Sequence, residues 1–202
     1  MRIGIDFDNT IVDYSGVFHA AALERELIPA GLETTRTAVR DYLNGRGQKD
    51  AFTELQGYVY GARMELARCY PGVREFVAAA LADGHGVFIV SHKTPRPLLG
   101  PAYDLHAAAQ GFLEASGLFA AGMMAPGDTH FEASKEAKIA RVAELRLDAF
   151  IDDLPEILAA PAFPAATRRL LFAPDGPPGA LPAGAETYRT WPDISQALLL
   201  RP

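Results

Sequence analysis

The sequence predicts an α/β fold, a parallel sheet with helices on both faces and a small helical insertion after the first strand. Three observations predict it. Short apolar runs of strand length alternate with segments of helical period. The runs are almost continuously hydrophobic, as in strands covered on both sides. One long helical segment interrupts the alternation, and 202 residues suffice for a core domain with such an insertion.

The predicted strands are short and rich in β-branched or aromatic residues. They are RIGIDF (2–7), VFIVS (87–91), DAFID (148–152) and RLLFA (169–173). Helices are predicted between and after them, the first ending at a glycine and the second beginning at a serine that can cap it. These are VREFVAAALADG (73–84), SKEAKIARVAEL (134–145) and the amphipathic WPDISQALLL (191–200).

The interruption covers residues 14–70, which show helical patterns but no convincing strand. This segment is too long for a simple crossover and too patterned for a loop, so we expect a helical insertion. The core domain is then residues 1–13 and 71–202. Two segments rich in proline, or in proline and glycine, at 94–101 and 173–184, are predicted surface loops.

Composition restricts the class of protein. The formal net charge is −6, whereas a nucleic-acid surface needs a basic face, so we expect no nucleic-acid polymer as partner. The single cysteine, Cys69, excludes an intrachain disulfide. No apolar stretch is long enough to cross a bilayer, and two aspartates interrupt the only apolar run near the N-terminus. We therefore expect a cytoplasmic protein with no membrane partner; the sequence leaves its oligomeric state open.

Acidic and hydroxyl side chains gather at the predicted strand ends. Asp6 and Asp8 end the first strand, Ser91 the second, and Asp152 with Asp153 the third. Residues beyond the carboxyl ends of parallel strands project into the crevice where such sheets bind ligands. Unpaired buried charges are costly, and oxygen-rich surroundings suit a hard cation such as Mg²⁺. The structural alternative is that these acids merely cap turns or helices.

At this point the sequence resembles the haloacid dehalogenase (HAD) superfamily of phosphohydrolases. DFDNT is similar to the first signature of that superfamily, D-x-D-x-[TV]. The other signatures follow in order: a strand ending in Ser91, a lysine on a helix, and the paired acids of IDDL. The insertion lies where the superfamily carries a C1-type helical cap. The resemblance covers the chain outside the insertion and implies a Rossmann-like core.

The resemblance implies a role for each matching residue. Asp6 would be the nucleophile that forms an aspartyl-phosphate, and Asp8 the general acid and base. Thr10, Ser91 and a lysine would bind the phosphoryl oxygens. Mg²⁺ would be held by the side chains of Asp6 and Asp152 and by the backbone carbonyl of Asp8. Asp153 would orient a metal-bound water.

The lysine of the third signature has two candidates. Lys135 and Lys138 are three residues apart and therefore lie on one face of the same predicted helix. Lys138 is favoured by its distance from the next acidic strand end. Lys135 is nearer the helix start and stays an alternative.

Three alternative functions remain at this stage. A dehalogenase needs no second acid, because halide leaves without a proton, so Asp8 favours phosphorus chemistry. Phosphotransfer to a second substrate is possible. A non-catalytic Mg²⁺-binding or interaction module on the same scaffold is expected to have lost at least one signature. All four signatures are present in the sequence.

Substrate specificity is expected to come from the insertion and from the loop after Ser91. QGYVYGARM (56–64) offers hydrogen bonds, rings and a positive charge, although the same tyrosines could pack inward on an amphipathic helix. The candidates are Gln56, Tyr58, Tyr60 and Arg63, with His92 and Lys93 beside the phosphate end. Solvated loop positions account equally well for Lys93. A small cap suits a sugar phosphate or a nucleoside monophosphate, and the sequence does not choose between them.

Overall fold

The computed structural model describes residues 1–177, 179, 181 and 183–200. The chain divides into two compact units. The first unit contains residues 1–12, 69–93 and 114–202, and the second contains residues 13–68 and 94–113. Two short strands, β2 (Val12–Asp13) and β3 (Arg68–Cys69), pair with each other where the chain passes from one unit to the other. Each unit is described by itself below.

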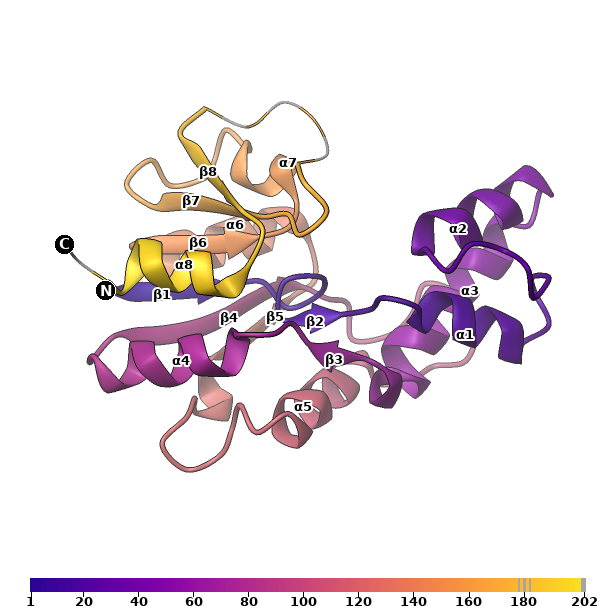
Figure 1. Cartoon of the computed structure of the whole chain (residues 1–202), viewed down its shortest axis with the longest axis horizontal. Coiled ribbons are helices and arrows are strands. Elements are labelled where there is room, and N and C mark those ends of the chain that lie inside the picture. Colours follow the sequence, from indigo (N-terminus) through magenta and orange to yellow (C-terminus); the bar gives the residue numbers. More distant parts are fainter. Residues whose placement is uncertain (178, 180, 182, 201–202) are drawn as a thin grey trace. The chain divides into compact units, whose positions relative to one another are not determined.

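The first unit is built on a six-stranded parallel sheet with the order β5-β4-β1-β6-β7-β8 (Figure 1). Its strands are β1 (Arg2–Ile5), β4 (Gly86–His92), β5 (Thr129–Glu132), β6 (Ala149–Asp152), β7 (Arg168–Phe172) and β8 (Ala185–Tyr188). In β1, Ile5 is paired with Ile89 on one side and with Ile151 on the other. The strand that begins the chain therefore lies inside the sheet, between β4 and β6.

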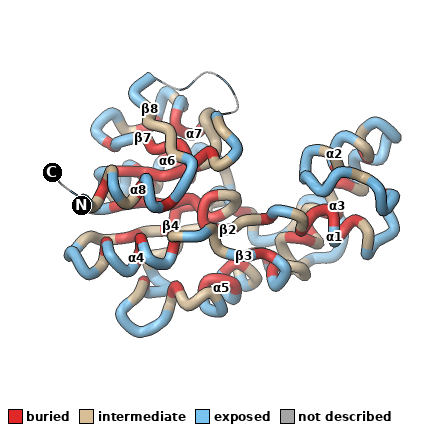
Figure 2. The backbone as a smooth tube through the Cα atoms, viewed as in Figure 1, coloured by how far each residue is buried: buried red, intermediate tan, exposed pale blue. Residues whose placement is uncertain are grey.

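Helices cover both faces of this sheet. One core contains buried side chains of α6 (Lys135–Glu144) and α7 (Pro155–Leu158) packed on β4, β6 and β7. On the other face lie α4 (Val73–Ala82), against β4, and α8 (Trp191–Leu198), against β8. The rings of Phe76 and Trp191 join α4 to α8, with centroids 5.1 Å apart. Figure 2 shows that the central strands are buried, as covering on both faces requires.

The second unit is helical. It contains α1 (Val17–Glu24), α2 (Arg36–Gly45), α3 (Lys49–Ala62), the short 3₁₀ helix η1 (Met64–Leu66) and all but the last two residues of α5 (Leu105–Ala115). Its core is aromatic: Tyr60 packs edge-on against Tyr14 and Phe18, with centroids 5.2 and 5.7 Å apart. Within the described part of the chain, every helix is too short or too polar to cross a lipid bilayer.

Two glycines of α3 let the segment 94–105 pack directly on this helix. A Cβ atom on Gly57 would lie 2.6 Å from Cβ of Pro97, and one on Gly61 would overlap the side chain of Tyr103. Real Cβ atoms essentially never come this close to another atom. The proline-rich segment after β4 belongs to the second unit for this reason, and α3 continues through both glycines without a break.

The four strands expected from sequence are present within two residues of their expected ends, and so are the three helices. Two strands of the sheet, β5 and β8, were not expected, because every residue in them is only partly buried and neither has an apolar run. Helix α5 was not expected either. The predicted loop at 173–184 lies partly outside the described residues, at 178, 180 and 182.

Candidate active site

The central strands bring the predicted strand-end residues to one edge of the sheet. Asp6 follows β1 directly, and its backbone N–H donates to the carbonyl of Ile151 at 2.9 Å. Ser91 is buried near the end of β4, and Asp152 is the last residue of β6. Because β1 lies between β4 and β6, this edge is where the strand order reverses. Open parallel sheets bind ligands at such a point.

The loop after β1 turns at Asn9, which has a φ of 58°. Asparagine is one of the few residues that accept this left-handed conformation readily. Beyond it, the backbone carbonyl of Thr10 accepts a hydrogen bond of 3.2 Å from the indole N–H of Trp191. The hydroxyl of Thr10 is buried and has no hydrogen-bond partner within the described residues. An unpartnered buried hydroxyl is costly, so this one suits a ligand oxygen.

Lys138 supplies a buried positive charge to the same edge. It lies on α6, which begins where the Ser134 hydroxyl accepts a hydrogen bond from the N–H of Ala137 at 3.1 Å. Its Nζ lies 2.6 Å from Oδ1 of Asp6 and 2.6 Å from Oδ2 of Asp152. Burial by itself lowers the pKa of Lys138, but Asp152 and Asp6 outweigh it, and the pKa is raised overall.

Three carboxylates converge beside this lysine. Asp6, Asp152 and Asp153 each offer an oxygen within 4.8 Å of the others. Burial raises the pKa of Asp152, opposed by Lys138. Burial also raises the pKa of Asp153, together with the negative charges of Asp6 and Asp152. One lysine therefore leaves this group of acids short of positive charge, and an oxygen-binding cation would relieve the repulsion.

Asp8 has a different partner. Both of its carboxylate oxygens accept hydrogen bonds from Nζ of Lys93, at 3.0 and 2.8 Å. The side chain of Lys93 is only 3% exposed and that of Asp8 20% exposed. Sequence reasoning placed Lys93 either near the substrate or in solvent. The pairing joins residues 85 positions apart and leaves no local signal in the sequence.

The remaining candidates of the first unit lie as follows. Lys135 forms a surface ion pair with Glu156 at 3.0 Å, with side-chain exposures of 45% and 55%, so of the two candidate lysines only Lys138 is buried among the acids. His92, the last residue of β4, is exposed.

In the second unit, Tyr58 and Arg63 bind a neighbouring side chain. Both donate hydrogen bonds to the carboxylate of Glu24, Tyr58 Oη at 2.9 Å and Arg63 Nε at 2.8 Å. The guanidinium of Arg63 also lies over the ring of Tyr58, 4.8 Å from its centroid. The Arg63 hydrogen bond, with that of Tyr58, lowers the pKa of Glu24 to about 2. In this structure the polar groups of Tyr58 and Arg63 are therefore engaged within the unit.

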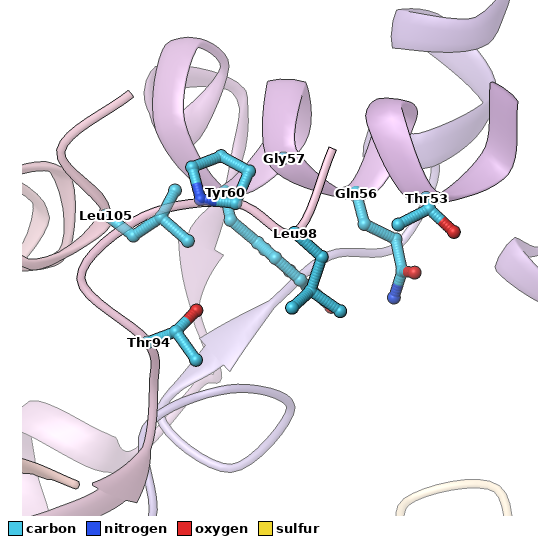
Figure 3. Close-up of a pocket in the computed structure, with 8 residues that line it drawn as sticks. Thr53, Gln56, Gly57, Tyr60, Thr94, Leu98 and Leu105 are labelled. Carbon is cyan, nitrogen blue, oxygen red and sulfur yellow. The ribbon is translucent and has the colours of Figure 1, made fainter. Parts of the chain in front are cut away.

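Gln56 and Tyr60 line a small cavity within the second unit, with a volume of about 130 Å³. Figure 3 shows it between helix α3 and the segment that begins at Thr94. Its walls combine apolar groups with three hydroxyl-bearing side chains and one amide. They are formed by Thr53, Gln56, Gly57, Tyr60, Thr94, Pro97, Leu98 and Leu105.

No family model matches the sequence, and no curated protein matches it. Solved structures do match. A HAD family hydrolase of Deinococcus radiodurans R1, with bound phosphate and sodium, aligns at 15% identity and a TM-score of 0.60, covering 98% of this chain and 94% of that one. A predicted phosphoglycolate phosphatase of Haemophilus somnus aligns at 15% identity and 0.58, covering 97% and 96%.

A third match is a Bacillus subtilis protein described as a HAD-hydrolase and bound to magnesium. It aligns at 13% identity with a TM-score of 0.55, covering 98% of each chain. Identities this low carry information on the fold and not on the reaction. These similarities span nearly the whole chain, and the parallel sheet with helices on both faces agrees with the α/β core expected from the sequence. The chain therefore has the fold of the HAD superfamily.

Proposed function

We propose that this protein is a magnesium-dependent phosphomonoester hydrolase that acts on a small organic phosphate. One observation carries the proposal: Asp6, Asp152 and Asp153 lie together around Lys138 at the end of the central strand. The fold supports it, because several solved structures with this fold are described as HAD hydrolases or phosphatases. The hydroxyl of Thr10 in the adjoining loop, which has no partner among the described residues, adds a donor for a phosphoryl oxygen.

The reaction divides into two displacements. A carboxylate oxygen of Asp6 attacks phosphorus and forms an aspartyl-phosphate, while the bond from phosphorus to the leaving oxygen breaks. That oxygen takes a proton from Asp8. A water molecule then attacks the same phosphorus, gives a proton to the Asp8 carboxylate, and displaces Asp6 with release of phosphate. Lys138, Thr10 and Ser91 bind the phosphoryl oxygens throughout.

The donor set fits Mg²⁺. Three mutually close carboxylates whose charges are only partly balanced by Lys138 suit a small divalent cation that prefers oxygen ligands. We propose Asp6 and Asp152 as side-chain ligands and the backbone carbonyl of Asp8 as a third, with Asp153 orienting a water of the ion. When bound, Mg²⁺ would neutralise charge on the phosphoryl group and polarise it toward attack.

The substrate is proposed to be a small phosphorylated metabolite, a sugar phosphate or a nucleoside monophosphate, acted on in the cytoplasm. Residues 14–70 are the proposed C1-type cap on a core of residues 1–13 and 71–202. Among the candidate specificity residues, Gln56 and Tyr60 line the cavity of the second unit, while Tyr58 and Arg63 are held by Glu24. We therefore give Gln56 and Tyr60 the larger share in substrate selection.

Phosphate release from 4-nitrophenyl phosphate and from a panel of sugar phosphates and nucleoside monophosphates, with and without Mg²⁺, tests the proposal. We expect activity that needs Mg²⁺ and is lost in Asp6→Asn, which keeps the shape of the side chain but removes the nucleophile. Activity that survives Asp6→Asn would exclude the proposed nucleophile. A folded protein that binds Mg²⁺ but hydrolyses nothing would favour the non-catalytic alternative, and transfer of phosphate to an added alcohol in preference to water would favour a phosphotransferase.

A further inference from the structure

We infer that Lys93 is a positioning residue that acts on the reaction through Asp8, an inference that rests on the function proposed above. Nζ of Lys93 contacts both carboxylate oxygens of Asp8, at 3.0 and 2.8 Å. A contact to each oxygen fixes the plane of the carboxylate as well as its position. A group that must pass a proton to a leaving oxygen and then take one from water needs such fixed geometry.

The side chain of Lys93 is built into the core of the first unit. Its backbone N–H donates to the carbonyl of Glu132 at 2.9 Å, which ties the residue to β5. Its Nζ lies 5.2 Å from the ring centroid of Phe7, the residue between Asp6 and Asp8. Phe7 is fully buried and packs edge-on against Phe131, with centroids 5.8 Å apart. The ammonium group of Lys93 therefore lies beside the buried ring of Phe7 and contacts Asp8.

Stability alone is a poor explanation for this pair. A buried ion pair contributes little net stability, because removing two charges from water costs about as much as their attraction returns. The pair instead holds the carboxyl group of Asp8 in one position and one orientation, because Nζ of Lys93 contacts both of its oxygens.

The test is a double-mutant cycle with two substrates that differ in their need for a proton. Lys93→Met keeps the length of the side chain and removes its charge. We expect it to lower kcat/KM by about 10- to 100-fold, the usual cost of a displaced catalytic group. The loss should be larger for phenyl phosphate than for 4-nitrophenyl phosphate, because phenolate is the poorer leaving group. In an Asp8→Asn background, Lys93→Met should change the rate by less than about threefold, since its partner is already gone.

Lys49→Met is the matched control, since it is the same substitution at an exposed lysine of α3, and should leave both rates unchanged. The inference is overturned if Lys93→Met costs as much in the Asp8→Asn background as in the native protein. It is equally overturned if the loss lies in KM alone and is the same for both substrates, as expected of a residue that binds phosphate directly. Full activity of Lys93→Met in a protein that Asp6→Asn inactivates refutes this inference and leaves the proposed function standing. An inactive native protein refutes both.

Thermal unfolding shows whether Lys93→Met is folded. If it is not, a crystal structure of the native protein with Mg²⁺ and tungstate, which mimics phosphate, decides the matter. If Nζ of Lys93 still contacts the carboxylate of Asp8 in that structure, the inference is supported. If Nζ contacts the tungstate oxygens and no longer contacts Asp8, the inference is overturned.

Discussion

Nζ of Lys138 lies 2.6 Å from Oδ2 of Asp152, and both side chains are almost completely buried. The lysine comes from helix α6 and the aspartate from the end of β6, so the pair joins a crossover helix to the strand that follows it. The same Nζ contacts Asp6 at the end of β1. Two strand ends of the sheet therefore share one positive charge.

Lys138→Met should destabilise the fold by about 3–5 kcal/mol, because buried carboxylates would lose their counter-charge. Urea unfolding in EDTA measures this free energy. Lys135→Met is the matched control, since Lys135 pairs with Glu156 at the surface, and should cost less than about 1 kcal/mol. Equal losses in the two variants would contradict the burial of Lys138.

The proposed Mg²⁺ site predicts that Mg²⁺ raises the melting temperature of the native protein, because an ion bound among the clustered acids of the folded state would relieve their repulsion. At a concentration of 100 times its Kd the gain is about 2.7 kcal/mol. Asp152→Asn removes one carboxylate from the cluster and should greatly reduce the Mg²⁺-induced shift in Tm. Asp148→Asn changes a surface aspartate that accepts a hydrogen bond from the N–H of Arg2, and should leave that shift intact. A shift of the same size in both variants would place the ion elsewhere.

The contact between Glu24 and Arg63 should weaken in acid. The pKa of Glu24 is lowered to about 2 by the hydrogen bonds of Arg63 and Tyr58, from 4.5 in a free side chain. A lowered folded-state pKa means that the stabilisation is complete above pH 4.5 and is lost as the pH falls toward 2.

Glu24→Gln tests this contact in thermal melts of both proteins. The variant should melt below the native protein at pH 7, and the difference should shrink at pH 3. Glu65→Gln, at a carboxylate 3.6 Å from Arg63, should show a smaller difference at pH 7. A gap for Glu24→Gln that is constant with pH would contradict the lowered pKa.

Gly61→Ala should destabilise the protein although alanine favours helices. A glycine in a helix interior normally costs about 1 kcal/mol relative to alanine, so the change is usually favourable. At Gly61 the added methyl group would overlap Tyr103, and such overpacking costs about 1–3 kcal/mol. Gly111→Ala, within α5, should stabilise the protein, because a Cβ atom at this position would meet no other part of the described chain within 4 Å beyond its own helix. Chemical denaturation of the two variants checks the opposite signs, and stabilisation of both would mean that segment 94–105 does not pack on α3.

Asn9→Val should impair both folding and phosphate release. The φ of 58° at Asn9 is strongly unfavourable for a β-branched residue, by about 1–2 kcal/mol, and the loop that carries Asp8 and Thr10 would have to move. Asn9→Gly accepts this conformation and should keep most of the activity. The rates of the two variants with 4-nitrophenyl phosphate provide the comparison. Equal rates would show that the turn does not constrain the loop.

The sequence was sufficient for the centre of the sheet and not for its edges. Strands β1, β4, β6 and β7 are apolar runs, which burial on both faces demands. In contrast, β5 (THFE) and β8 (AETY) are edge strands whose residues are all partly exposed, so neither shows an apolar run. Helix α5 buries Leu105, Ala109, Phe112 and Leu113, and this helical spacing is visible in the sequence. The helix was not predicted because it follows a proline-rich segment that was predicted to be a loop.

For the candidate site, the clustering of the acids could be predicted, because unpaired carboxylates beside buried strands are energetically costly. The pairing of individual side chains could not be predicted. The burial of Lys138 and the bond from Lys93 to Asp8 depend on the crossing of helices and strands far apart in the chain. The two hydrogen bonds from the guanidinium of Arg63 to the carboxylate of Glu24 likewise depend on the packing of α3 against α1.

The hydrogen bond from Trp191 to the carbonyl of Thr10 links the loop after β1 to a residue 181 positions later. During synthesis on the ribosome, the loop that holds Asp8 therefore lacks this hydrogen bond until residue 191 has been made. A nascent chain that stops short of the tryptophan can contain the residues of every strand from β1 to β8 and still lack the donor for the Thr10 carbonyl.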